Sequence, residues 1–134
     1  MTVLINILTR TGNREAYFNT LKKTIENQTY KNIRHLKSND NPDCKYLENE
    51  KDVFRVIKND TQGEAFYNLY LNELGKKIKK GWVIILDDDS KLINNNFIKE
   101  LAEECSISKP NEILIYQSYL LNKKIPEKKN NNPW

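Results

Sequence analysis

Three consecutive aspartates, Asp87 to Asp89, directly follow four apolar residues, Val83 to Leu86. Adjacent carboxylates repel one another, so this arrangement costs free energy unless positive charge lies among them. Magnesium and manganese prefer oxygen ligands, and magnesium is often held by one or two carboxylates together with substrate phosphates. The triplet therefore predicts a divalent metal, Mn²⁺ or Mg²⁺, held by Asp87 and Asp89 and carrying a nucleotide diphosphate. Asp88, between them, is expected to accept a hydrogen bond from a ribose.

The aspartate triplet also has two other interpretations. Acidic residues are common where a strand leaves a sheet, and an aspartate there often caps the next helix. A buried strand followed by Asp-x-Asp also opens the haloacid-dehalogenase-like phosphatases, in which the first aspartate is the nucleophile. That motif usually lies on the first strand with Thr or Val two residues after the second aspartate. Here it is mid-chain and Lys91 occupies that place, so the phosphatase is the less favoured alternative.

The chain supplies few residues for other kinds of catalytic or metal site. His35 is the only histidine, and the two cysteines, Cys44 and Cys105, lie far apart without a Cys-x-x-Cys spacing. A zinc site of the Cys/His type and a Ser-His-Asp triad are therefore not expected. Two free thiols are the simpler interpretation of the cysteines, although a disulfide stays open.

The composition fits one globular domain. The 134-residue chain is 38% hydrophobic and 30% charged, and none of its apolar runs approaches the roughly 20 residues that cross a bilayer. The amino terminus MTVLINILTRTGN has no basic leader and reads as a strand, which predicts a cytoplasmic protein. A net charge of +4 favours an anionic ligand such as a nucleotide. Because no aromatic RNA-binding platform is recognisable, specific nucleic-acid binding is not expected.

Apolar periodicity predicts strands that alternate with helices. Residues 3–8 and 82–86 are apolar at almost every position, which is typical of parallel strands buried on both faces. A weaker strand is expected at 33–37, a short one at 52–58 and the last one at 112–121, and helices are expected at 14–27, around 66–75 and from 97 to about 105. The apolar positions of the first helix are Tyr17, Phe18, Leu21 and Ile25.

This alternation predicts a three-layer α/β/α sandwich with a mainly parallel sheet. We expect one domain over residues 1–122, followed by a polar tail, 123–134. In such sheets ligands bind at the carboxyl ends of the strands. Three polar clusters are expected at that edge: residues 9–14, 38–43 and 87–90.

Two stretches resemble the family-2-like glycosyltransferases of the GT-A fold. They are ILTRTGNREAYFNTLKKTIENQTYKNIRHLKSND (residues 7–40) and YNLYLNELGKKIKKGWVIILDDDS (67–90), and the similarity extends over residues 3–101. The resemblance implies a GT-A-like (Rossmann-like) nucleotide-binding half that carries the Asp-x-Asp motif. It further implies transfer of a sugar from a UDP- or GDP-linked donor to a glycan or other hydroxyl acceptor.

The resemblance also assigns roles by position. Thr9 and Arg10 would contact the base and ribose, Asp40 would accept a hydrogen bond from the base, and Asp89 would be the principal metal ligand. The implied nucleotide-binding residues are Thr9, Arg10, Arg14, Asp40, Asn68, Asp87 and Asp88, and the implied metal ligands are Asp87 and Asp89. Plain structural interpretations stay open: solvated helix-entry charges for the arginines, a turn residue for Asp40, and an exposed helix position for Asn68.

The catalytic base is missing from this pattern. An inverting transferase needs a carboxylate to deprotonate the acceptor hydroxyl, and in the resembled family it comes from a segment well after Asp-x-Asp. The acidic residues after the triplet are Glu100, Glu103, Glu104, Glu112 and Glu127, and none is marked as a base. The chain is therefore expected to be a minimal transferase, a nucleotide-sugar- or carbohydrate-binding half that needs a partner chain or oligomer, or a truncated form without turnover.

Overall fold

The computed structural model describes residues 3–39, 41–56, 67–110, 112, 119–120 and 123–124. Its elements follow the alternating order expected from the sequence. They are β1 (Ile5–Thr11), α1 (Glu15–Glu26), β2 (Ile33–Asn39), β3 (Val53–Arg55), α2 (Tyr67–Gly75), β4 (Trp82–Ile85), α3 (Phe97–Ile107), β5 (Tyr119–Leu120) and β6 (Lys123–Lys124).

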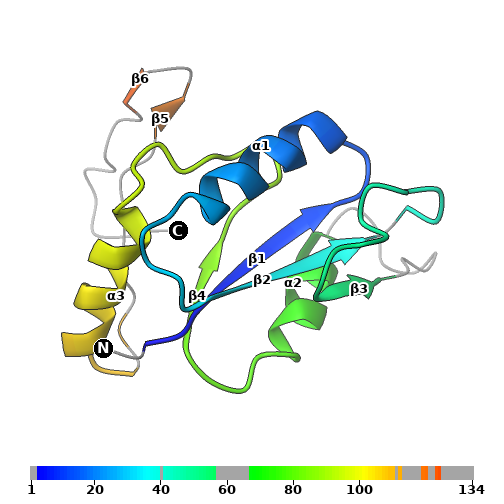
Figure 1. Cartoon of the computed structure of the whole chain (residues 1–134). Coiled ribbons are helices and arrows are strands. Elements are labelled where there is room, and N and C mark those ends of the chain that lie inside the picture. The colour runs from blue at the N-terminus through cyan, green and yellow to red at the C-terminus, as the bar shows by residue number, and fades with distance from the viewer. Residues whose placement is uncertain are drawn as a thin grey trace.

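The main sheet has four parallel strands in the order β3-β2-β1-β4 (Figure 1). β1 is the central strand and pairs with β2 from Ile5↔Ile33 to Thr11↔Asn39. It continues three residues beyond the predicted end at Leu8, because β2 offers partners as far as Asn39. This extension carries the polar end of β1 to the carboxyl edge of the sheet.

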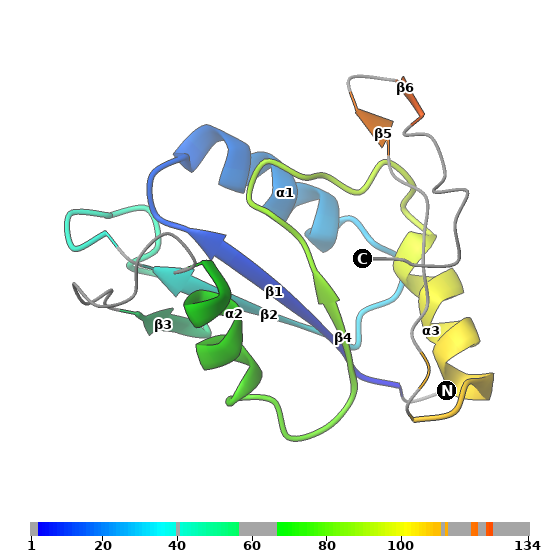
Figure 2. The ribbon, with the colours of Figure 1, turned by 180° about the vertical axis from the view of Figure 1, so that it is seen from behind.

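Helices cover both faces of the sheet, so the predicted three-layer α/β sandwich is confirmed. α1 and α3 pack on one face against Ile5 and Ile7 of β1. α2 lies on the opposite face, as the two views in Figures 1 and 2 show, where its Leu74 packs against Leu8 and Leu36. At the carboxyl edge of the sheet, residues 13, 14, 87 and 89 are exposed, and we call this edge, formed by residues 9–14 and 87–90, the rim.

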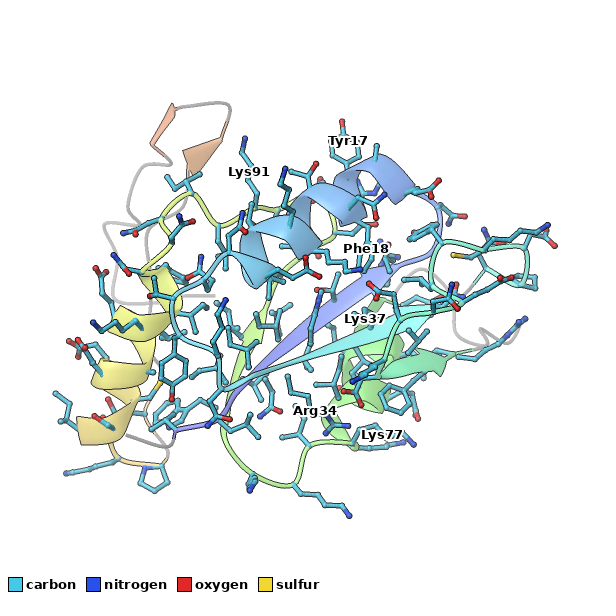
Figure 3. The ribbon with its side chains drawn as sticks, in the orientation of Figure 1. Tyr17, Phe18, Arg34, Lys37, Lys77 and Lys91 are labelled. Carbon is cyan, nitrogen blue, oxygen red and sulfur yellow. The ribbon has the colours of Figure 1, made fainter. Side chains whose placement is uncertain are left out.

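The first helix uses a narrower apolar stripe than the sequence indicates. Phe18, Leu21 and Ile25 are buried as expected, whereas Tyr17 is 59% exposed. Figure 3 shows Phe18 directed from α1 toward the strands and Tyr17 directed away from them. The prediction that Tyr17 belongs to the buried face is wrong: Tyr17 lies four residues before Leu21 but at the margin of the stripe, where its ring turns to solvent beside the Arg14 guanidinium.

β4 is buried on one face only, which corrects the expectation for residues 82–86. Trp82 and Ile84 pack into the cluster beneath α1 and α3. Val83 and Ile85, on the other face, are 48% and 54% exposed. α2 packs on β1 and β2, and β4 is an edge strand of the described sheet. An outermost strand can be continuously apolar without being covered on both sides.

The carboxyl-terminal predictions are only partly covered. Within the expected strand 112–121, Tyr119–Leu120 form β5, which pairs antiparallel with β6 in a separate two-stranded sheet. β6 lies at the start of the predicted tail, and the rest of the tail lies outside the described residues. In the part of the chain that the structure describes, none of the helices is both long and apolar enough to span a membrane.

Candidate functional site

The carboxyl edge of the sheet brings the polar ends of β1 and β4 together. β1 and β4 run parallel in register from Ile5↔Trp82 to Leu8↔Ile85, and the Leu86 N–H donates to the Leu8 carbonyl at 3.0 Å. The chain then makes a turn in which the Ser90 N–H donates to the Asp87 carbonyl at 3.0 Å. The aspartate triplet therefore lies beside the end of β1, as predicted for ligand sites in parallel sheets.

Asp88 is the buried member of the triplet, with 3% of its surface exposed. Its Oδ1 pairs with Nη2 of Arg14. Its Oδ2 accepts a hydrogen bond from the Thr11 hydroxyl at 3.0 Å. A buried carboxylate is stable only when it is paired, and here both of its oxygens have partners within the chain. The predicted hydrogen bond from a ribose to Asp88 stays a prediction.

Arg14 supplies positive charge to the triplet. Its Nη1 lies 3.3 Å from Oδ2 of Asp89, in addition to the pairing with Asp88. Its guanidinium carbon is 5.9 Å from the centre of the Tyr17 ring. Burial by itself would lower the pKa of Arg14, but the hydrogen bond and charge of Asp88 outweigh it and raise that pKa. From the sequence, Arg14 could also have been a solvated charge at the start of a helix. In the structure its side chain pairs with Asp88 and Asp89 at the rim.

Asp87 and Asp89 are the exposed members of the triplet. The Asp89 side chain is 48% exposed, so a ligand can reach it. Among the described residues, three or more His, Cys, Asp or Glu side chains do not gather at any one place that could hold a metal. A cation at this rim would therefore need ligand oxygens, such as those of a diphosphate, to complete its coordination.

The other predicted nucleotide-binding residues lie in different surroundings. Thr9 is fully buried, and its hydroxyl is 2.8 Å from Nε2 of His35. Arg10 lies on the α2 face, with its guanidinium carbon 5.6 Å from the Tyr70 ring centre. Asp40 lies outside the described residues, and Asn68 lies in α2 with its side chain outside them. The rim thus has Arg14 on the α1 side and Arg10 on the α2 side.

Tyr46 belongs to this site but carries no signal in the sequence. It lies in the polar segment between β2 and β3, and its hydroxyl is 2.7 Å from both Thr11 Oγ1 and the backbone nitrogen of Gly12. Gly12 has φ 145°, a conformation that L-residues with a side chain rarely adopt. Because residues 12 and 46 are far apart in the chain, local patterns do not indicate this contact.

Gln28 ties the segment that follows the triplet to α1. Its fully buried side chain donates from Nε2 to the Asn94 carbonyl at 2.9 Å and accepts from the Ile98 N–H at 3.0 Å. The Leu92 N–H donates to the Thr24 hydroxyl at 3.0 Å. These bonds fix the path of the chain after Ser90. The turn of residues 87–90 is therefore held by β1 and Arg14 at its start and by α1 in the segment that follows it.

Comparison with known proteins supports the fold. The chain matches neither a family model nor a curated protein sequence. Among solved structures it resembles two crystal structures of TarS from S. aureus, a glycosyltransferase. One has 16% identity over 87% of this chain and 24% of that chain, with a TM-score of 0.59. The other, TarS 1-349, has 16% identity over 90% of this chain and 43% of that chain, with a TM-score of 0.60.

At this identity the likeness shows the fold alone. The domain has a glycosyltransferase-like fold, with a four-strand parallel sheet and three helices. The chain spans less than half the length of either TarS structure.

Proposed function

We propose that this chain is the nucleotide-sugar-binding domain of a GT-A glycosyltransferase, which moves a sugar from a UDP- or GDP-linked donor to a hydroxyl acceptor. The fold and the sequence resemblance point to the same class. The observation that carries the proposal is the turn of residues 87–90 at the carboxyl edge of the sheet, where Asp87 and Asp89 are exposed and Asp89 lies 3.3 Å from Arg14.

The donor set of this rim fits a phosphate-bound divalent cation. Asp87 and Asp89 offer hard oxygen ligands, and Mg²⁺ and Mn²⁺ are commonly held by one or two carboxylates together with phosphate oxygens. When bound, such a cation acts as a Lewis acid that neutralises the charge of the departing nucleotide diphosphate. The carboxylate of Asp89, which is exposed and accepts from Arg14 at 3.3 Å, is the principal ligand that the family resemblance implies.

Arg14 and Arg10 complement the negative charge of the diphosphate. Arg14 carries a planar set of donors that suits phosphate, and its side chain is 42% exposed. Arg10 lies across the sheet edge, on the α2 side. We assign both to the nucleotide, with Thr9, Asp40 and Asn68 as further contacts predicted from the family resemblance.

The acceptor side of the reaction is the open part of this proposal. Glu100, Glu103 and Glu104 lie on the exposed side of α3, a helix that packs against Ile5 and Ile7 rather than against the rim. Glu112 is exposed, and Glu127 lies outside the described residues. None of these four glutamates, the described ones that follow the triplet, is placed as a base for an acceptor hydroxyl.

A second candidate function is a binding module without turnover, for a nucleotide sugar or a carbohydrate. It is favoured by the positions of Glu100, Glu103, Glu104 and Glu112, none of which is placed as a base for an acceptor hydroxyl. A partner chain or an oligomer would then have to supply the acceptor site. The phosphatase interpretation gains no support, since the similar structures are those of a glycosyltransferase.

Thermal unfolding with a panel of nucleoside diphosphates tests the proposal. A ligand that binds only the folded chain raises its melting temperature. At about 100 times Kd the stabilisation is about 2.7 kcal/mol, which corresponds to a shift of roughly 5 °C or more for a domain of this size. We expect this shift with UDP or GDP plus Mn²⁺ and a much smaller one without the metal. An unchanged melting temperature with every nucleotide would overturn the proposal.

Donor hydrolysis then separates the two functions. A transferase releases nucleotide from a UDP- or GDP-sugar, and release increases when a suitable acceptor is present. A binding module shows the thermal shift and releases no nucleotide with any acceptor.

A further inference from the structure

The Tyr46 hydroxyl links the loop between β2 and β3 to the rim. Its oxygen lies 2.7 Å from the Gly12 nitrogen and 2.7 Å from the Thr11 hydroxyl. Thr11 is 4% exposed and its hydroxyl also bonds Asp88. The contacts therefore form one continuous path from the backbone at Gly12 to the buried carboxylate of the triplet.

The chemistry of the groups sets the direction of every bond in this path. The Gly12 N–H can only donate, so the Tyr46 oxygen accepts from it. The Asp88 carboxylate can only accept, so the Thr11 proton points to Oδ2 of Asp88. The remaining proton, that of Tyr46, then points to the Thr11 oxygen. Hydrogen bonds that run in one direction polarise one another and strengthen the last acceptor bond, here the one at Asp88.

The Tyr46 ring is itself held in place. Its centre lies 5.6 Å from that of Phe18, at an interplanar angle of 42°, and Phe18 is buried beneath α1. Asn41, in the same loop, donates to the Gly12 carbonyl at 2.9 Å. The hydroxyl is therefore presented by a packed aromatic ring.

We propose that Tyr46 is a positioning residue of the nucleotide-binding rim, which acts through Thr11 on Asp88. Asp88 is the anchor of Arg14 in this assignment. With one oxygen fixed by Thr11, its other oxygen faces Arg14, and the guanidinium stays beside Asp89. The part of this assignment that concerns ligand binding rests on the proposed function, whereas the internal linkage does not.

If Tyr46 only stabilised its loop, the experiments would give different results. Removal of a loop tie would lower stability and leave nucleotide affinity unchanged. The matched control is Tyr30, whose hydroxyl donates to the Val3 carbonyl at the opposite edge of the sheet. Tyr46→Phe and Tyr30→Phe each remove one partly buried hydroxyl and keep the ring.

The first measurement needs no ligand. Urea unfolding of wild type, Tyr46→Phe, Asp88→Asn and the double variant forms a thermodynamic cycle. We expect the effect of Tyr46→Phe on the unfolding constant to be about fivefold smaller in the Asp88→Asn background. The cycle of Tyr30→Phe with Asp88→Asn should be additive. Additive effects for Tyr46 as well would overturn the linkage.

The second measurement is calorimetric binding of UDP or GDP with Mn²⁺. We expect Tyr46→Phe to weaken binding about tenfold, because the Arg14 guanidinium is then no longer held in place beside Asp89 before the phosphates arrive, and Tyr30→Phe to change it less than twofold; a tenfold loss corresponds to roughly 1.4 kcal/mol. Thr11→Val breaks the same path at another residue and should reproduce the loss if Tyr46→Phe does not fold. Wild-type affinity in Tyr46→Phe, or an equal loss in Tyr30→Phe, would overturn the positioning role.

The two measurements separate this inference from the proposed function. If the wild-type chain binds none of the nucleotides, the proposed function fails, and the unfolding cycle alone decides whether Tyr46 positions Asp88. If nucleotides bind but the cycle is additive, the proposed function stands and the inference about Tyr46 is wrong.

Discussion

At the scale of single residues, Arg14 supplies the positive charge that offsets the repulsion among the three aspartates. Asp88 is buried and pairs with the Arg14 guanidinium, while Asp89 stays half exposed at 3.3 Å from the same group. The guanidinium of Arg14 thus reduces the free-energy cost of placing three carboxylates next to one another. A ligand at the rim must either share Arg14 with Asp88 or draw it toward its own phosphates.

Arg14→Gln should therefore destabilise the fold. The variant leaves the buried Asp88 carboxylate with only Thr11 as a partner, and an unpaired buried charge costs several kcal/mol. Because the Arg14 side chain is 42% exposed, solvent screening reduces this cost, and we expect about 1–2 kcal/mol by urea unfolding. The control is Arg34→Gln, which breaks the pair with Asp52, whose carboxylate is 32% exposed rather than buried, and should cost about 0–1 kcal/mol. Equal losses would contradict the role of Arg14.

At the scale of elements, a polar layer fastens α1, β1 and β2 together below the rim. His35 of β2 lies 2.8 Å from the Thr9 hydroxyl of β1 and stacks on Phe18 of α1 at a centroid distance of 6.0 Å. Lys37, two residues further along β2, is 6% exposed and donates to the Lys51 carbonyl at 2.9 Å. The His35 contacts thus join β1, β2 and α1, and the Lys37 bond joins β2 to the segment before β3.

Stability should fall when the pH is lowered, because of His35. Burial, together with the charges of Lys37 and Lys22, lowers the pKa of His35 to about 3 in the folded chain. The unfolded chain binds the proton below about pH 6.5 and the folded chain does not, so the free energy of unfolding decreases as the pH falls through that range. We expect a loss of about 2 kcal/mol between roughly pH 7.5 and pH 5.

Urea unfolding across that pH range measures the effect. His35→Gln should flatten the dependence, whatever its effect on stability at neutral pH. The same pH dependence in wild type and variant would show that His35 does not stay neutral in the fold.

At the scale of the whole molecule, the three layers of helices and sheet could be predicted from the sequence, because each buried face requires apolar residues at regular intervals along its helix or strand. The stripe of Phe18, Leu21 and Ile25 and the apolar residues of β1 report buried surfaces directly. The exposure of Val83 and Ile85 could not be predicted, because an apolar strand reads alike at the centre and at the edge of a sheet.

The site was predictable only in part, for a similar reason. The triplet and its place at the carboxyl edge follow from strand order and from the rule for parallel sheets. The contacts of Asp88 with Thr11 and of Tyr46 with Gly12 join residues 77 and 34 positions apart. Such pairings depend on tertiary packing and have no local pattern, so the sequence indicates the place of the site but not which aspartate is buried.

The central claim is that the exposed carboxylates of the triplet hold a divalent cation together with a nucleotide diphosphate. Calorimetric titration of UDP and GDP, with and without Mn²⁺, into wild type and Asp89→Ala tests it most directly. The Asp89 side chain is 48% exposed, so its removal should leave the fold intact. We predict metal-dependent binding in the wild type and a loss of at least about 100-fold in the variant, since even outer partners of metal ligands contribute 10- to 100-fold. Equal metal-dependent affinities in the two proteins would contradict the claim.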